Sequence, residues 1–442
     1  MGRQRTQADR QVADLLRTAK SSLGLSVAFL SRLDGTMQHL EVVESSVPFL
    51  FKEGATQRQE TTFCQAILEG RLPAVIPDVA ALPEAMRLPA ARLPRIRSYV
   101  SVPVVLSDGS VYGTFCAAGL SSDKGLTRRD RSLMDVLAHA AAVIIEPGVV
   151  EAARRGQIES RLGPVIEAGG PDVVLQPIVN LAGGHRIGAE ALSRFPAQWA
   201  MAPDICFAQA HSVGLGDQLE LLAIERAAGF LEQVSGYVAL NVSPGTAMTV
   251  AFAELMARLP VQRVLLELSE HAQVEDYTAL GAALEGPRSR GMRLAIDDVG
   301  AGFSSLRHIV LTSPEVIKLD RTLVHGVSAD PVLRTLVRSL VEFGHGCGAS
   351  VVAEGVETDT DAQTLLELGV DHGQGWHFGR PGGPEHLAPC WPVGNPPAPG
   401  RSRADGTHQG AAGAVDVAAA SGSGGHRDWA GADPGLRSGQ GL

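Results

Sequence analysis

Short apolar runs alternate with polar turns over the first 125 residues, and one long amphipathic segment follows them. Residues 25–33, 40–43 and 74–79 have the composition of strands. The segment SYVSVPVVLSDGSVYGTFCAAGL then predicts a hairpin, because Asp108-Gly109 separates two runs of alternating apolar and polar residues. This order predicts an N-terminal α/β domain.

The amphipathic segment TRRDRSLMDVLAHAAAVII predicts a helix. Thr127 and Asp130 have the spacing of a capping box at its start. Its apolar face consists of Leu133, Leu137, Ala140, Ala141 and Ile144. Pro147-Gly148 predicts the end of the helix.

Eight further strand-like runs follow, most of them separated by helical segments. They occupy residues 173–181, 186–195, 237–242, 263–269, 293–299, 315–319, 350–356 and 372–378. Eight strands over about 230 residues are typical of a (β/α)8 barrel. Only AGGH separates the first two runs, whereas a parallel pair needs a connection of about a dozen residues or more. We therefore expect a modified TIM barrel in which the first strand is antiparallel.

The last 50 residues differ in composition from the rest of the chain, since 22 of them are Gly or Ala and none is Ile or Phe. Such a segment buries too little apolar surface to offset the entropy of ordering it, so we expect a disordered tail. The predicted domains are residues 1–150, 151–392 and 393–442.

Composition excludes several classes of protein. The chain has 38 Lys and Arg against 48 Asp and Glu, a formal net charge of −10, which excludes an overall basic surface for nucleic acid or an anionic membrane. His139, Glu146 and Pro147 interrupt the most apolar segment, so no membrane span is expected. The five cysteines are far apart and form no CxxC pair, which fits a reducing compartment, and we expect a cytoplasmic protein. We interpret Cys64 and Cys116 as small buried apolar residues rather than redox or chromophore sites.

Acidic residues follow the apolar runs of the predicted barrel. They are Glu190 in GAEALSRF, Glu267 and Glu270 in LLELSE, Asp297 and Asp298 in LAIDDVGAG, and Glu354 and Glu357 in VVAEGVET. Carboxylates that meet at a barrel mouth repel one another unless a cation neutralises them. Their oxygens, and the amide oxygen of Asn241 in ALNVSP, suit Mg²⁺ or Mn²⁺ rather than zinc.

This set of oxygen ligands exceeds what one magnesium ion normally takes from a protein. Two metals that share a carboxylate would use it, and the adjacent Asp297 and Asp298 can supply one bridging and one terminal ligand. Such a pair serves in-line displacement at phosphorus. Lys318 in EVIKLDR could orient the attacking hydroxide and offset charge in the transition state.

The motifs QPIVNL, EALSRF, NVSP, ELSE, IDDVGAGFSSL, IKLDR, AEGVET and HGQGWHFGRP occur in the order and spacing of the EAL domain, which residues 158–390 resemble. That family comprises phosphodiesterases that linearise cyclic di-GMP. The resemblance implies a first metal bound by Glu190, Asn241, Glu267 and Asp297, and a second bound by Asp297, Asp298 and Glu354. It implies Lys318, Glu354 and Glu190 as catalytic residues and Gln176, Leu192, Arg194 and Gln374 as substrate contacts. Glu270 resembles the glutamate that steadies the loop at residues 298–306, and Glu357 matches a further glutamate of the family.

Three positions depart from the family pattern: Asn180, Ser193 and Val299. None is a metal ligand, although Val299 replaces a Phe of the loop that couples dimer contacts to metal binding in the family.

Residues 8–146, with the hairpin motif SDG-x-x-Y-G-T-x-C, resemble a GAF domain. Such domains bind small ligands or dimerise and regulate the domain attached to them. The resemblance therefore implies an unidentified small ligand, a homodimer and a route of control through the helix that starts at Thr127.

Three functions compete at this point: a cyclic di-GMP phosphodiesterase that yields linear pGpG and uses Mg²⁺ or Mn²⁺, a catalytically silent cyclic di-GMP receptor, and an unrelated Mg²⁺-dependent barrel enzyme. The complete ligand set favours the phosphodiesterase over the receptor, and the motif contexts disfavour a generic barrel. No GG[DE]EF run occurs, so synthesis of the dinucleotide is not expected.

Overall fold

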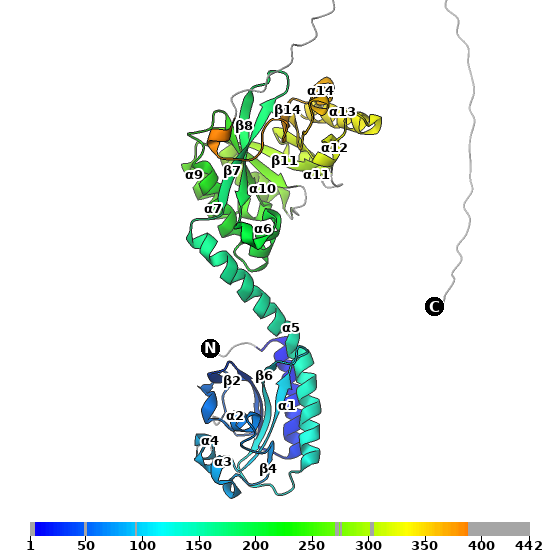
Figure 1. Ribbon diagram of the computed structural model, residues 1–442. Coiled ribbons are helices and arrows are strands. Elements are labelled where there is room, and N and C mark those ends of the chain that lie inside the picture. The colour runs from blue at the N-terminus through cyan, green and yellow to red at the C-terminus, as the bar shows by residue number, and fades with distance from the viewer. Residues whose placement is uncertain are drawn as a thin grey trace, which may run out of the picture. The chain divides into compact units, whose positions relative to one another are not determined.

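The computed structural model describes residues 5–47, 51–92, 95–269, 274, 276–300 and 305–387. Within them an antiparallel sheet with helices on both faces is followed in sequence by a closed eight-stranded barrel, as Figure 1 shows. The mixed α/β fold and the modified barrel predicted from the sequence are therefore confirmed. The predicted tail, residues 393–442, lies outside the described residues.

The N-terminal sheet has six strands in the order β3-β2-β1-β6-β5-β4, and all neighbouring strands are antiparallel. The strands are β1 (Val27–Leu33), β2 (Met37–Ser45), β3 (Thr56–Arg58), β4 (Val75–Ile76), β5 (Ser98–Val105) and β6 (Val111–Gly119). The predicted hairpin is β5–β6. Its turn needs Gly109, whose φ of +84° lies in the left-handed region that glycine favours.

Each face of this sheet carries its own apolar core. The helices are α1 (Gln7–Leu23), α2 (Phe63–Leu68), α3 (Pro83–Arg87) and α4 (Pro89–Arg92), with 3₁₀ turns at Gln59–Thr61 and Val79–Ala81. Leu16 of α1 and Phe115 of β6 belong to the core that α1 shares with the long helix α5 (Arg128–Glu167). Phe63 of α2 and Tyr99 of β5 belong to the core on the other face.

Helix α5 corrects one prediction. The capping box is confirmed, because Thr127 and Asp130 exchange the expected hydrogen bonds. The predicted end at Pro147-Gly148 is wrong, since the helix runs through Pro147 to Glu167. An internal proline costs a helix about 3 kcal/mol. Packing on both sides of Pro147 offsets this cost: the N-terminal half belongs to the core on the six-stranded sheet, and Ile158 and Leu162 belong to a core with barrel residues.

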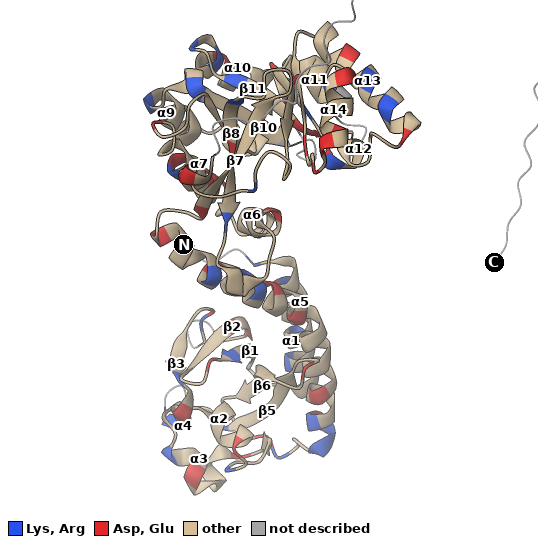
Figure 2. Ribbon diagram, turned by 45° about the horizontal axis from the view of Figure 1, so that its top comes forward, with Lys and Arg blue, Asp and Glu red and all other residues tan. Residues whose placement is uncertain are grey.

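Among the described residues, α5 is the one helix that is long and apolar enough to cross a membrane by length and composition. Ion pairs lie along it, between Arg131 and Asp135 (3.7 Å) and between Glu151 and Arg154 (3.0 Å). Figure 2 shows residues of both charges along this helix. Part of the helix belongs to the cores described above.

The barrel closes in the order β10-β11-β12-β13-β14-β7-β8-β9. Its strands are β7 (Asp172–Asn180), β8 (Arg186–Arg194), β9 (Tyr237–Val242), β10 (Val264–Ser269), β11 (Arg293–Val299), β12 (Val316–Leu319), β13 (Ser350–Ala353) and β14 (His372–Gln374). Strand β7 is antiparallel to both neighbours, β8 and β14, whereas the other pairs are parallel. The predicted antiparallel first hairpin is confirmed.

Helices cover the outside of the barrel. They are α6 (Pro203–Ser212), α7 (Gly216–Ala228), α8 (Pro244–Ala247), α9 (Val250–Arg258), α10 (Tyr277–Ser289), α11 (Ser305–Thr312), α12 (Arg321–Val324), α13 (Pro331–Gly346) and α14 (Asp359–Glu367). Single 3₁₀ turns lie at Ala197–Trp199, Val261–Arg263 and Pro384–His386.

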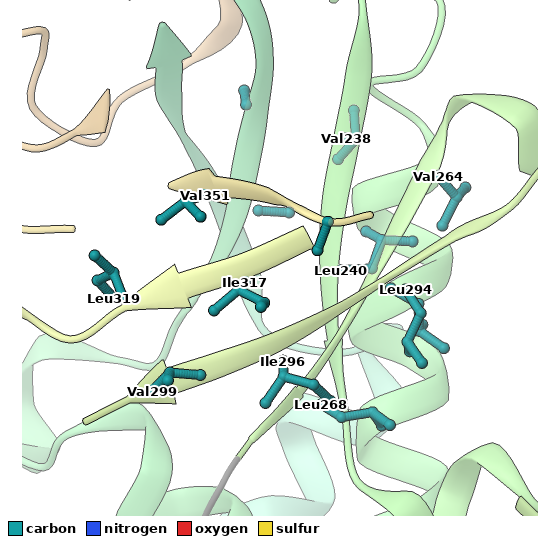
Figure 3. Close-up of a cluster of buried hydrophobic side chains, with 14 of the residues drawn as sticks. Val238, Leu240, Val264, Leu268, Leu294, Ile296, Val299, Ile317, Leu319 and Val351 are labelled. Atoms are coloured by element: carbon teal, nitrogen blue, oxygen red, sulfur yellow. The ribbon is translucent and has the colours of Figure 1, made fainter. Parts of the chain in front are cut away.

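Alternate residues of each barrel strand point to opposite sides of the sheet. Val238, Leu240, Leu294 and Ile296 belong to the large core between strands and helices, part of which Figure 3 shows. The intervening positions point into the barrel, where an apolar layer contains Ala239, Leu265, Ala295, Val316 and Val352. The next inward position on each of these strands is polar, so the alternation of the strands sets the location of the candidate site.

Candidate active site

Five neighbouring strands place a polar residue two positions beyond this apolar layer, toward the carboxyl ends of the strands. These residues are Asn241 on β9, Glu267 on β10, Asp297 on β11, Lys318 on β12 and Glu354 directly after β13. The register pairs Glu267 with Asn241 on the adjacent strand. Period-two alternation thus carries five sequence-distant residues to one end of the barrel, where TIM barrels have their active sites.

Lys318 lies at the centre of this group. Its Nζ is 3.0 Å from Glu267 Oε2, 3.0 Å from Asp297 Oδ1, 2.5 Å from Glu354 Oε1 and 3.6 Å from Glu190 Oε2. Lys318 is 1% exposed and Glu267 is fully buried. One ammonium therefore faces four carboxylates in a site largely removed from water.

Burial and the charge of Lys318 or its carboxylate neighbours shift the pKa values of these groups in opposite directions. Burial lowers the pKa of Lys318, but the surrounding carboxylates, Asp297 foremost, outweigh burial and raise the pKa well above its usual value. Burial raises the pKa of Glu267 and of Glu354 well above the usual range, although Lys318 opposes this shift. The site therefore holds more negative charge than its one lysine neutralises, and this is the electrostatic setting that favours a bound cation.

The donor set fits divalent metal ions. Ligand oxygens of Glu190, Glu267 and Asp297 lie within 4.8 Å of one another, as do those of Asp297, Asp298 and Glu354. Asp297 belongs to both groups. Both carboxylate oxygens of Glu267, Oδ1 of Asp297 and Oε1 of Glu354 are buried and accept no hydrogen bond, and three of these four oxygens share the single ammonium of Lys318. Buried carboxylate oxygens with so little compensation are costly, and hard cations such as Mg²⁺ and Mn²⁺ would satisfy them.

Asp298 has an unusual backbone. Its φ of +57° lies in the left-handed region that non-glycine residues rarely adopt. Since Asp297 and Asp298 are adjacent on one strand, they would normally point to opposite sides of the sheet. The strained conformation accompanies a register irregularity between Ile296 and Val299 and allows both carboxylates to approach Glu354.

Two amides hold the Glu190 carboxylate. Asn241 Nδ2 donates to Glu190 Oε1 at 2.9 Å, and Gln374 Nε2 donates to Glu190 Oε2 at 2.6 Å. Gln374 also donates to Gln176 Oε1 at 3.2 Å, across the antiparallel β14–β7 pair. The predicted residues Gln176 and Gln374 are thus both buried, and Gln374 orients Glu190 while Gln176 accepts from Gln374.

Leu192 and Arg194 lie at a cavity next to this cluster. The cavity has a volume of about 330 Å³, and Asn241 and Ser243 also line it. Leu192 is partly buried and Arg194 is exposed. The predicted substrate contacts therefore fall into two groups, one inside the carboxylate cluster and one at the adjoining cavity.

Of the two glutamates predicted to stabilise the loop, the structure describes Glu357 and not Glu270. Glu357 accepts a hydrogen bond from Arg321 Nη2 at 2.7 Å and does not belong to either ligand group. Glu270 lies outside the described residues, as do residues 301–304 of the loop that it was predicted to steady.

Glu220 of α7 is a further residue near the site that was not predicted from the sequence. Its carboxylate is 7% exposed, accepts from the backbone N–H and the hydroxyl of Ser243 at 2.9 Å each, and lies 2.5 Å from His211 Nε2. Ser243 follows Asn241 by two residues, so Glu220 fixes the chain directly after that predicted ligand. An acidic residue on the buried face of an amphipathic helix was the signal that could have identified it.

Comparison with known proteins gives two family matches. The model of the EAL domain matches residues 160–381, and that of a GAF domain matches residues 9–146. A protein of Mycobacterium bovis is 32% identical over 242 residues, which are 51% of this chain and 39% of that protein. A second protein of the same organism is 28% identical over 266 residues, 54% of this chain and 87% of that protein.

Solved structures are also similar. The Klebsiella pneumoniae BlrP1 complex with manganese and cyclic di-GMP is 32% identical, covers 48% of this chain and 56% of that chain, and has a TM-score of 0.43. The PaMucR phosphodiesterase complex with cyclic di-GMP is 26% identical, covers 52% and 100%, and has a TM-score of 0.47. The chain spans about two fifths of the length of the first curated relatives it matches. Since the EAL model covers half of the sequence, the chain belongs to the EAL domain family and carries a GAF domain ahead of the barrel.

Proposed function

We propose that this chain hydrolyses one phosphodiester bond of cyclic di-GMP and releases linear pGpG. The observation that carries the proposal is the convergence of Lys318 and four carboxylates at the end of an EAL barrel. A receptor that only binds the dinucleotide has no need of every carboxylate. The complete set therefore favours an enzyme.

Glu190, Asn241, Glu267 and Asp297 would hold one Mg²⁺ or Mn²⁺, and Asp297, Asp298 and Glu354 a second, with Asp297 shared. When bound, such a pair supplies an activated water and neutralises charge on the phosphate. The buried carboxylate oxygens that share the single ammonium of Lys318 support this assignment.

The protein's own groups position the reaction. Lys318, whose ammonium carries three N–H donors, would orient the attacking water and stabilise charge on the phosphoryl oxygens. Asn241 and Gln374 fix both oxygens of Glu190, so this carboxylate is held in place before substrate binds. Glu354 contacts Lys318 at 2.5 Å and limits the movement of its ammonium.

The dinucleotide would approach this cluster over the carboxyl ends of the strands. Arg194 is exposed at the cavity and offers a guanidinium to a phosphate, and Leu192 offers an apolar contact to a base. Gln176 and Gln374 would contact the phosphate next to Glu190.

We also propose that the GAF domain, through a small ligand not yet identified, controls the barrel within a homodimer, and that α5 links the two domains. The helix is continuous, and its residues belong both to the GAF core and to a core with barrel residues. We also propose a cytoplasmic location, because the five cysteines are far apart in the sequence and form no CxxC pair, as expected in a reducing compartment.

The test is to incubate the purified full chain with cyclic di-GMP and Mg²⁺ and to separate the nucleotides by chromatography. Linear pGpG is the expected product. Glu190→Ala removes a ligand and should reduce turnover by about a thousandfold or more, the scale at which loss of a preorganised charged group acts. Ca²⁺ in place of Mg²⁺ should inhibit, because its longer bonds and looser geometry misplace the phosphate.

Glu342→Ala is the matched control, since Glu342 is an exposed glutamate of α13. It should retain wild-type turnover. Turnover of Glu190→Ala within tenfold of wild type would overturn the assignment. Binding of cyclic di-GMP by the wild-type chain without hydrolysis would make the protein a receptor instead.

A further inference from the structure

Two cysteines that are 52 positions apart meet in the core of the GAF domain. Cys64 lies on α2 and Cys116 on β6, the strand between β1 and β5. Their sulfur atoms are 3.4 Å apart, and the residues are 1% and 0% exposed. The sequence alone gave no reason to pair them.

The surroundings of the two sulfurs are polar, although they lie within an apolar core. Gln38 Nε2 is 2.9 Å and Tyr99 OH is 3.1 Å from Cys64 Sγ. Ser101 Oγ and Thr114 Oγ1 are each 3.2 Å from Cys116 Sγ. A cysteine that serves only as a small apolar residue needs no such partners. Four side-chain hydrogen-bonding groups arranged around two thiols form a site that can stabilise a thiolate.

Burial and hydrogen bonding act differently on the two thiols. Burial raises the pKa of Cys64, but hydrogen bonds from Cys116, Thr114, Tyr99 and Gln38 outweigh it and lower the pKa to about 6. Burial, together with the neighbouring Cys64, raises the pKa of Cys116 well above its usual value. The surroundings therefore favour the thiolate form on Cys64 over the thiolate form on Cys116.

We propose that Cys64 and Cys116 are a redox-active pair that a hydroperoxide converts into a reversible disulfide within the GAF domain. The sulfur atoms need to approach by roughly 1.4 Å to reach the disulfide bond length of about 2.05 Å. Helix α2 has six residues, so a small shift of this short element supplies the movement. This proposal does not depend on the function proposed for the barrel.

The chemistry balances with hydrogen peroxide as the oxidant. The Cys64 thiolate attacks one peroxide oxygen, the O–O bond breaks, and the departing hydroxide takes up a proton to become water, which leaves a sulfenic acid on Cys64. The sulfur of Cys116 then attacks the Cys64 sulfur and loses its proton, the S–O bond breaks, and the second water leaves. Two thiols lose two electrons in all, and one peroxide becomes two waters.

Oxidation would also change the hydrogen bonds of this core. The charge that Gln38 and Tyr99 stabilise disappears when the Cys64 thiolate becomes a disulfide sulfur, which is a weak acceptor. Gln38 Nε2 keeps its bond to Ser31 Oγ at 2.8 Å, and its Oε1 keeps the bond from Gln57. The core therefore retains partners for the amide in both redox states.

The test uses the purified full chain, fully reduced and then exposed to hydrogen peroxide. Remaining thiols are blocked with N-ethylmaleimide under denaturing conditions, and the chain is digested with trypsin without reductant. Cleavage leaves Cys64 in residues 59–71 and Cys116 in residues 98–124, and each peptide contains one cysteine. Mass spectrometry should find these two peptides cross-linked, lighter than their sum by two hydrogens, and dithiothreitol should separate them.

Cys206→Ser and Cys347→Ser are the matched controls, and the cross-link should form in both. It should be absent in Cys64→Ser and in Cys116→Ser. Recovery of Cys64 and Cys116 as blocked thiols after peroxide treatment of the wild-type chain would overturn the proposal. A sulfinic acid on Cys64 beside a blocked thiol on Cys116 would overturn it as well, because the second thiol would then not have reacted. Both outcomes are read on the wild-type protein, so the test does not depend on the folding of a variant.

Discussion

At the scale of single residues, the candidate site is organised by an imbalance of charge. Lys318 is the one cation within 4.0 Å of Glu190, Glu267, Asp297 and Glu354 in the part of the chain that the structure describes. Removing one partner of a buried ion pair leaves an uncompensated charge. Lys318 therefore stabilises the fold in the absence of metal as well as serving the proposed reaction.

Lys318→Met should consequently lower the free energy of unfolding by about 3–5 kcal/mol in EDTA, the cost of breaking a buried pair. Mg²⁺ should recover part of this loss, because a bound cation also compensates the carboxylates. Urea denaturation with and without Mg²⁺ measures both effects. Lys124→Met, at an exposed position, should change neither value. An equal loss of stability with and without Mg²⁺ would contradict metal binding at this site.

At the scale of elements, a close backbone contact joins the end of β14 to the turn after β13. Val356 N donates to Gln374 O at 3.0 Å, and a Cβ added at Gly375 would overlap the backbone of Val356. Gln374 orients Glu190, and Glu354 precedes Val356 by two residues. Gly375 therefore allows the end of β14, which carries Gln374, to lie against the turn that follows Glu354.

Gly375→Ala should separate these elements and reduce hydrolysis of cyclic di-GMP by about a hundredfold, the effect expected from a displacement of about 1 Å in an active site. Steady-state kinetics and the Mg²⁺-induced rise in melting temperature measure the change, and both should fall. Gly281→Ala is the control, because Gly281 lies within α10 and a Cβ there meets no atom within 4 Å. Wild-type turnover in Gly375→Ala would refute this role.

At the scale of the whole molecule, α5 presents apolar residues to solvent. Val136, Val143 and Val150 are 66%, 62% and 60% exposed. They are spaced by seven residues, or about two helical turns, and so lie along one stripe of the helix. A second copy of the chain would cover this stripe, in agreement with the proposed homodimer.

Val143→Asp in the full chain should therefore shift the protein from dimer to monomer, because it places a charge in the centre of the stripe. Size-exclusion chromatography with light scattering would show the mass halved. Val332→Asp on α13, where the valine is 72% exposed, should leave the mass unchanged. A wild-type chain that is already monomeric at micromolar concentration would rule out the dimer.

Local pattern in the sequence determined most of the architecture of this protein. Alternation of apolar and polar residues predicted the strands, the short AGGH link predicted an antiparallel first hairpin, and strand-end acidic residues predicted a cation site. These features can be predicted from the sequence because the period of two in a strand and the length of a connection depend only on residues that are close together in the chain.

Tertiary structure alone decided the rest. Helix α5 continues through Pro147 because the packing of both of its halves outweighs the cost of an internal proline, and only that cost could be predicted from the sequence. Cys64 and Cys116 meet, and Glu220 reaches Ser243, only because sheet order and helix placement bring distant segments together. Such contacts depend on how elements pack against one another, and no local pattern in the chain encodes that packing.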